Sequence, residues 1–149
     1  MNQTITLGIR AAQALLGIIV LGLTAYVASN FWSLSTSNFM LFNGVWTAFI
    51  VVPYMVLAPM FFPVAAHIFA IIAVDAVTMI FWFAGFIALG ADLPGPKFCR
   101  SSPCHSLQAA TVFGAFEWML FTATLVFAAL PVIRNRGGPK PNEGIQPAV

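Results

Sequence analysis

The fold is decided by stretches such as residues 64–89, VAAHIFAIIAVDAVTMIFWFAGFIAL, whose only charged residue is Asp75. A transmembrane helix needs roughly 20 mostly apolar residues, because the hydrocarbon core of a bilayer is about 30 Å thick and a helix rises about 1.5 Å per residue. Residues 64–89 are long and apolar enough to meet that requirement. They predict a membrane-spanning helix that carries one carboxyl group near its middle.

The whole chain has the composition of a membrane protein. Of its 149 residues, 60% are hydrophobic and 7% are charged, whereas ordinary globular chains are about 45–50% apolar and about 25% charged. Between positions 11 and 91, Asp75 is the only charged residue. So few charges cannot cover a water-soluble surface, which excludes a cytosolic enzyme, a secreted disulfide-rich domain and an ordinary nucleic-acid-binding protein.

Three further runs of similar length complete an all-α fold, an integral membrane four-helix transmembrane bundle. The runs read as apolar on all faces and lack the alternation of a β-barrel wall. One domain, residues 1–133, holds all the spans, and residues 134–149 are expected to be a disordered cytoplasmic tail because they are rich in Pro and Gly. The expected spans are residues 7–28, 39–60, 64–89 and 107–131.

The connections and the basic residues predict the orientation. A tight turn at residues 61–63 would make the second and third spans an antiparallel hairpin. Four spans place both termini on one side, and the positive-inside rule favours cytoplasmic termini. The first span is too long for a signal-peptide core and is expected to be retained. The terminal side carries Arg10, Arg134, Arg136 and Lys140, and the other side carries Lys97 and Arg100.

Cys99 and Cys104 are the two cysteines of the chain. Both lie in the loop of residues 91–106, which the basic residues place outside the cytoplasm. Two cysteines in one short loop of an oxidising compartment predict a disulfide. A zinc site would need four ligands, and only His105 is nearby, so we expect a loop staple and neither a metal nor a cofactor.

Asp75 and Glu117 are the most informative polar residues. They lie about 16 Å and about 15 Å along their spans, near the bilayer midplane. Arg10 lies near the cytoplasmic end of the first span, so no basic residue is expected at that depth. An ionised carboxylate there costs roughly 2.5–3.5 kcal/mol. We therefore expect Asp75 and Glu117 to form an intramembrane polar pair, with at least one acid protonated, and Asp75→Asn to be tolerated.

Small and aromatic residues near the two acids are possible lipid or helix contacts. Gly85 and Gly114 would allow neighbouring helices to approach closely, and Trp82 and Trp118 share their segments. The sequence contains no nucleophile paired with a base and no phosphate-binding loop. We therefore predict no catalytic residue.

Several segments carry a resemblance to a known family. Asp75 is followed by FWFAGFIAL at residues 81–89, then by the cysteine loop, and then by FGAFEW at residues 113–118. With four spans and short termini, these segments resemble a MARVEL-domain tetraspan membrane protein, and more narrowly the fungal branch that includes the non-classical export proteins. The resemblance covers residues 7–133, and Glu117 is not universal in the wider family.

The resemblance implies a role rather than a reaction. MARVEL proteins associate with sterol- and sphingolipid-rich membrane, shape vesicles or junctions and organise lateral domains. The implied protein is non-enzymatic, lies in the plasma membrane, and has as partners membrane lipids (sterol or sphingolipid) and a second copy of the chain or a membrane-coat protein, but not nucleic acid. Two alternatives stay open: a small proton-coupled transporter or channel that uses Asp75 and Glu117, and an accessory subunit of a larger complex.

Overall fold

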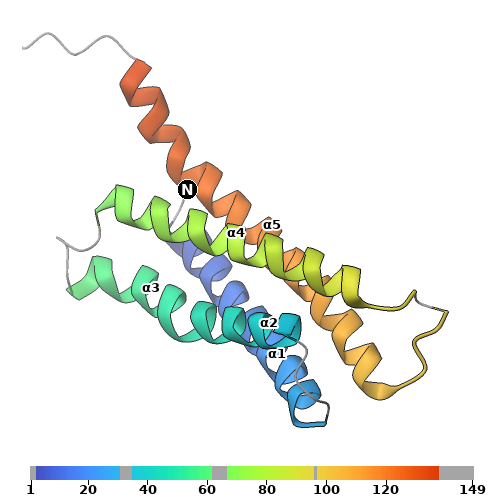
Figure 1. Cartoon of the computed structure of the whole chain (residues 1–149). Helices are drawn as coiled ribbons and strands as arrows, with labels where there is room; N and C mark the ends of the chain where they lie inside the picture. Colours follow the sequence, from blue (N-terminus) through green and yellow to red (C-terminus); the bar gives the residue numbers. More distant parts are fainter. Residues whose placement is uncertain (1–2, 31–34, 62–66, 96, 138–149) are drawn as a thin grey trace, which may run out of the picture.

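The computed structural model describes residues 3–30, 35–61, 67–95 and 97–137, and every regular element among them is a helix (Figure 1). Four helical stretches are long and apolar enough to cross a membrane. The second of them is made of α2, a π-helical segment η1, and α3 in continuous succession. The four-helix membrane bundle is thus confirmed. The elements are α1 (Gln3–Asn30), α2 (Ser35–Val45), η1 (Trp46–Val51), α3 (Val52–Phe61), α4 (Ile68–Asp92) and α5 (Ser102–Gly137).

Several helix ends differ from the expected spans. α4 begins at Ile68, after His67 as its N-cap, and not at residue 64. α5 continues through Pro131 to Gly137, so the first four residues assigned to a disordered tail are helical. A proline inside a helix removes one N–H donor and crowds the carbonyl four residues earlier, but transmembrane helices tolerate this. The expected tight turn at residues 61–63 and the rest of the tail lie largely outside the described residues.

The contacts between helices place α1 and α4 on opposite sides of the bundle. α1 packs against α5 and α2, and α4 packs against the same two helices. α1 and α4 therefore occupy opposite corners of a four-membered bundle, and a side chain that joins them must cross the interior. Figure 1 also shows that the C-terminal part of α5 projects beyond the other helices.

The π-helical segment shifts the buried face of the second span. The N–H of Val52 donates to the carbonyl of Thr47, five residues earlier, which widens one turn. The next residue, Pro53, has no N–H to continue the usual ladder. Because of the extra residue in this turn, one continuous face of the second span stays buried. It includes Met40, Thr47, Val51 and Met55.

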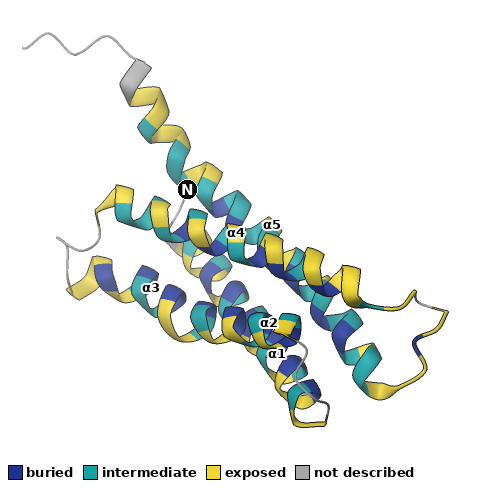
Figure 2. Cartoon of the chain, viewed as in Figure 1, coloured by how far each residue is buried: buried dark blue, intermediate teal, exposed yellow. Residues whose placement is uncertain are grey.

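The buried residues of the other spans follow a spacing of three and four. This spacing averages 3.5 residues and keeps one seam of each helix against its neighbours over the full length of a left-handed bundle. Figure 2 shows the buried positions on the inner faces and the exposed ones on the outside. On α1 the buried positions are Arg10, Gln13, Gly17, Val20, Thr24 and Val27, on α4 they are Asp75, Thr78, Trp82, Gly85 and Leu89, and on α5 they include Leu107, Ala110, Gly114, Glu117, Phe121 and Thr124.

The interior seam is unusually polar, and the expectation that the spans are apolar on all faces is wrong. Polar groups in hydrocarbon must find partners inside the protein, whereas apolar side chains lose nothing by facing lipid. Many large hydrophobic residues accordingly lie outside, as at Phe49 and Phe127, which are 64% and 53% exposed, although Trp82 and Phe121 are fully buried. The buried polar residues are Arg10, Gln13, Thr24, Ser37, Asn43, Thr47, Asp75, Thr78, Glu117 and Thr124.

Candidate functional site

A buried ion pair between Arg10 of α1 and Asp75 of α4 crosses the bundle interior. Nη1 of Arg10 donates to Oδ1 of Asp75, and Nη2 donates to Oδ2, each at 2.8 Å. The two side chains are 7% and 0% exposed. This fork-to-fork geometry gives two charge-assisted hydrogen bonds and fixes both side chains in one orientation. It ties together the two helices that lie diagonally across the bundle.

The ion pair corrects the expectation that no basic residue reaches the depth of Asp75. α1 begins at Gln3 and α4 begins at Ile68. Arg10 and Asp75 are therefore each seven residues into their helices, about 10 Å from the starts. The expected spans placed Asp75 too deep and Arg10 too shallow, and the long arginine side chain closes the remaining distance.

The expected hydrogen-bonded pair of Asp75 and Glu117 is not formed. Both oxygens of Asp75 accept from Arg10, and neither oxygen of Glu117 has a hydrogen-bond partner among the described residues. Glu117 is fully buried, and its Oε1 lies 3.6 Å from the point that a Cβ on Gly17 would occupy. The acid thus lies against α1, where the missing side chain of Gly17 makes room for it.

Gln13 lies between the ion pair and Glu117 along α1. Its Oε1 accepts a hydrogen bond of 3.0 Å from Arg10 Nη1. Its Nε2 is buried and has no partner within the described part of the chain. Gln13 is one turn before Gly17, against which Glu117 rests, so a polar track runs from Asp75 through Arg10 and Gln13 toward Glu117. Only the first three members are joined by hydrogen bonds.

Two tryptophan indoles tie the second span to α4. Nε1 of Trp82 donates to Oγ1 of Thr47 at 2.9 Å, and Nε1 of Trp46 donates to Oγ1 of Thr78 at 3.1 Å. Nδ2 of Asn43 also donates to the carbonyl of Phe81 at 3.0 Å. These bonds satisfy polar atoms inside the bundle and fix the relative positions of the helices. Trp82 is fully buried and is therefore a helix contact rather than a lipid contact.

Gly85 and Gly114 are also helix contacts. A Cβ on Gly85 would lie 2.6 Å from Sδ of Met40 and 2.8 Å from Nδ2 of Asn43. A Cβ on Gly114 would lie 2.9 Å from Cε of Met40. Met40 thus packs into the space left by glycines on two different helices. Trp118 is half-buried, and its ring centroid is 5.6 Å from that of Phe83 and 6.0 Å from that of Phe86.

Sequence reasoning missed a close approach of two backbones, between α1 and α2 at Gly44. A Cβ on Gly44 would lie 2.9 Å from the carbonyl oxygen of Gly17 and 2.9 Å from Cβ of Leu21. Small residues at such crossings allow close van der Waals packing in lipid. Isolated glycines inside apolar runs were the available signal, but the sequence does not say which glycine faces which helix.

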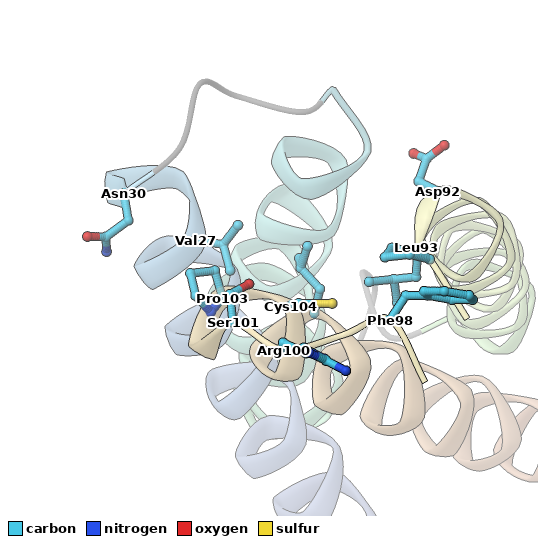
Figure 3. Close-up of a pocket in the computed structure, with 11 residues that line it drawn as sticks. Val27, Asn30, Asp92, Leu93, Phe98, Arg100, Ser101, Pro103 and Cys104 are labelled. Atoms are coloured by element: carbon cyan, nitrogen blue, oxygen red, sulfur yellow. The ribbon is translucent and has the colours of Figure 1, made fainter. Parts of the chain in front are cut away.

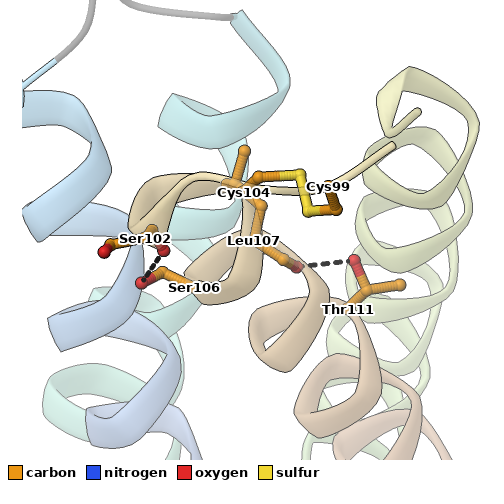
Figure 4. The surroundings of a disulfide bond; sticks show 6 residues. All are labelled: Cys99, Ser102, Cys104, Ser106, Leu107 and Thr111. Carbon is orange, nitrogen blue, oxygen red and sulfur yellow. Dashed lines mark hydrogen bonds between the residues drawn. A yellow bond between two sulfur atoms is a disulfide. The ribbon is translucent and has the colours of Figure 1, made fainter. Parts of the chain in front are cut away.

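The predicted disulfide is present at the opposite end of the bundle from the N-terminus. Cys99 and Cys104 are bonded to each other, with their Cα atoms 5.6 Å apart (Figure 4). Cys104 lies in the first turn of α5, and Cys99 is buried although it lies in the loop. The bond therefore holds the end of the loop against the start of α5.

A pocket of about 510 Å³ lies between this loop and the helix ends (Figure 3). Its volume is within the range of about 300–1,000 Å³ that is usual for small-molecule sites. The walls are mostly apolar, and charged and amide side chains from the loop and helix ends also line it. The lining residues are Val27, Asn30, Asp92, Leu93, Pro94, Phe98, Arg100, Ser101, Pro103, Cys104 and Leu107.

Comparison with known families identifies the chain. The MARVEL family, described as a membrane-associating domain, matches residues 3–127. The chain belongs to the MARVEL family. No curated protein and no solved structure matches it significantly. With the four spans, the match makes this chain a multi-pass integral membrane protein.

The MARVEL match covers the whole polar track and the pocket. It extends from the first residue of α1 to residue 127 in α5, and therefore includes Arg10, Asp75, Glu117 and the disulfide loop. The last ten residues of α5 follow it. The site residues described above thus all belong to the membrane-associating domain.

Proposed function

We propose that this MARVEL protein is a non-enzymatic tetraspan scaffold that organises or shapes lipid domains, or assists membrane trafficking. Sterol- or sphingolipid-rich plasma membrane is the proposed setting. The family description as a membrane-associating domain supports this role. The basic residues support cytoplasmic termini, because four lie on the terminal side of the spans and two on the other.

The single observation that carries the proposal is that the ionisable side chains of Arg10, Asp75 and Glu117 lie in the bundle interior, whereas large apolar side chains lie on its outer faces. The one ion pair found among the described residues, Arg10–Asp75, is buried, and both carboxylate oxygens of Asp75 accept hydrogen bonds from Arg10. The pair therefore holds α1 to α4. The outer faces carry large apolar side chains along all four spans. The surface that meets other molecules is thus mostly a lipid-facing surface, and its chemistry suits the sorting and packing of lipids.

Partition in phase-separated giant vesicles tests the proposal. The labelled full chain is reconstituted in vesicles of unsaturated phosphatidylcholine, sphingomyelin and sterol, which separate into ordered and disordered phases. We expect enrichment in the ordered phase or at its boundary. The double change Phe49→Ala with Phe127→Ala should weaken this enrichment, because both side chains face lipid.

A matched control for that pair is Arg134→Gln, which changes an exposed residue near the end of α5. It should leave the partition unchanged. A wild-type protein that distributes between the phases like an unrelated single-span helix would contradict the proposed role.

Glu117 supports a second candidate function, a small proton-coupled transporter or channel. Its buried carboxyl has no hydrogen-bond partner among the described residues, and intramembrane acids often serve ion or proton pathways. Asp75 is a weaker participant than expected, because Arg10 occupies both of its oxygens. A proton flux that is lost in Glu117→Gln would favour this candidate over the scaffold.

A further inference from the structure

The pocket under the disulfide loop lies where the apolar spans end, which is where lipid headgroups are expected. α1 ends at Asn30, α4 ends at Asp92 and α5 begins at Ser102, and the pocket is lined by residues at or near all three ends. The apolar spans finish at these positions. An occupant of this pocket therefore has its polar part at the membrane surface and its apolar part toward the bilayer.

The pocket presents two opposite charges that do not neutralise each other. Arg100 lies in the loop and Asp92 lies at the end of α4 (Figure 3). Neither residue takes part in an ion pair within the described ranges. Asp92 accepts a hydrogen bond of 2.5 Å from the hydroxyl of Thr36, which orients its carboxylate but leaves its charge uncompensated.

Phe98 adds an aromatic side chain to the lining of the same pocket. It is 79% exposed although it is a large apolar residue. Its N–H donates to the carbonyl of Gly95 at 2.8 Å, so the loop makes a local turn there. An aromatic face near a carboxylate attracts a quaternary ammonium group through cation–π and Coulomb interactions.

We propose that this pocket binds a membrane phospholipid with a zwitterionic phosphocholine headgroup. The guanidinium of Arg100 takes the phosphate, Asp92 and Phe98 take the trimethylammonium group, and the apolar wall formed by Val27, Leu93 and Leu107 takes the first part of the lipid chains. The disulfide holds Arg100 in place, because it anchors Cys99, the preceding residue, to α5. This inference deepens the proposed function and rests on it, because it names a lipid class and a place for it.

Charge complementarity decides between this lipid and the other amphiphiles of a membrane. A sterol offers one hydroxyl and would leave both charges without a partner. A phosphatidylglycerol would satisfy Arg100 but would place a negative headgroup beside Asp92. Only a headgroup with a negative phosphate and a positive end uses both sides of the pocket.

Native mass spectrometry of the full chain in a nonionic detergent tests the assignment. The probe is an equimolar mixture of palmitoyl-oleoyl phosphatidylcholine and palmitoyl-oleoyl phosphatidylglycerol, with cholesterol as a third competitor. The wild-type protein should retain one phosphatidylcholine in preference to the other two. Arg100→Gln should weaken that binding roughly tenfold, because it removes a charge-assisted contact with the phosphate.

Lys97 provides a matched control within the same loop. It is an exposed cation that does not line the pocket, so Lys97→Gln should leave binding unchanged. Asp92→Asn should move the preference from phosphatidylcholine toward phosphatidylglycerol by roughly fivefold, because it removes the repulsion of a negative headgroup. Ser101→Trp should block the pocket while both charges stay in place.

The outcomes separate this inference from the proposed function. Equal losses in Lys97→Gln and Arg100→Gln would overturn the pocket assignment, and so would a sterol that displaces the phospholipid. A wild-type protein that retains no phosphatidylcholine in detergent, but still partitions into the ordered phase of vesicles, would contradict the lipid assignment of the pocket and leave the proposed scaffold role intact. A protein that binds phosphatidylcholine at Arg100 but shows no preference between phases would contradict the scaffold role alone.

Discussion

Replacing Asp75 by Asn removes half of the buried ion pair and leaves the Arg10 guanidinium inside the bundle without its carboxylate. Asp75 accepts two hydrogen bonds of 2.8 Å from Arg10, and the two side chains are 7% and 0% exposed. Loss of one partner from a buried ion pair usually costs about 3–5 kcal/mol. Gln13 still accepts from Arg10, and the new amide oxygen still accepts one bond. We therefore expect the unfolding free energy to fall by about 3 kcal/mol, not the tolerance that the sequence alone predicted.

A double-mutant cycle isolates this interaction. Arg10→Met and Asp75→Met are measured singly and together, by reversible unfolding in mixed micelles with rising amounts of denaturing detergent. Each single change strands one charge, whereas the double change removes both, and such replacement of a whole pair is often close to neutral. We expect a coupling energy of at least about 2 kcal/mol.

Arg134→Gln is the matched control, because it removes an arginine from an exposed position on α5. Its effect should stay within about 0.5 kcal/mol. If the two single Met changes each cost less than about 1 kcal/mol and their effects simply add, then the ion pair does not hold α1 to α4.

Four further changes test other parts of the bundle. Glu117→Gln should keep the unfolding free energy within about 1 kcal/mol of wild type or raise it, because a buried carboxyl without a partner gains nothing from its charge; a loss as large as that of Asp75→Asn would mean that Glu117 has a strong partner. Gly44→Ala should cost about 1–3 kcal/mol, because its Cβ would lie 2.9 Å from the backbone oxygen of Gly17. Gly8→Ala, which meets nothing within 4 Å, should be neutral or slightly stabilising in the same unfolding assay. Cys99→Ser with Cys104→Ser should lower the unfolding free energy by at most about 2 kcal/mol, since the closed loop is short; mass spectrometry of the unreduced loop peptide should find the bond, and two free thiols there would refute it.

The number of spans and the disulfide could be predicted from the sequence because each depends on local features. Apolar length alone determines whether a helix can cross a bilayer. Two cysteines separated by five positions can be brought within bonding distance by a turn in one short loop. The helix ends were less predictable, because His67 and Pro131 lie inside apolar runs whose limits are set by backbone geometry and not by hydropathy.

The pairing of charges could not be predicted, because it depends on helix ends and on packing order together. The expected starts of the first and third spans were each wrong by a few residues, which placed Arg10 and Asp75 at different depths. In the structure each residue is seven residues into its helix. The diagonal placement of α1 and α4 is a property of the whole bundle. A usable signal was present in the spacing of Arg10, Gln13 and Gly17, which puts polar and small residues on one face of the first span.

The Arg10–Asp75 ion pair joins two helices of the bundle, and we expect neither this pair nor Glu117 to carry protons across the membrane. Proton flux into proteoliposomes tests this most directly, with a pH-sensitive dye inside and a potassium diffusion potential as the driving force. The wild-type protein and Glu117→Gln should both show the same flux as protein-free liposomes. A wild-type flux well above that background, abolished in Glu117→Gln while the variant stays folded, would contradict the claim and make the polar track a proton pathway.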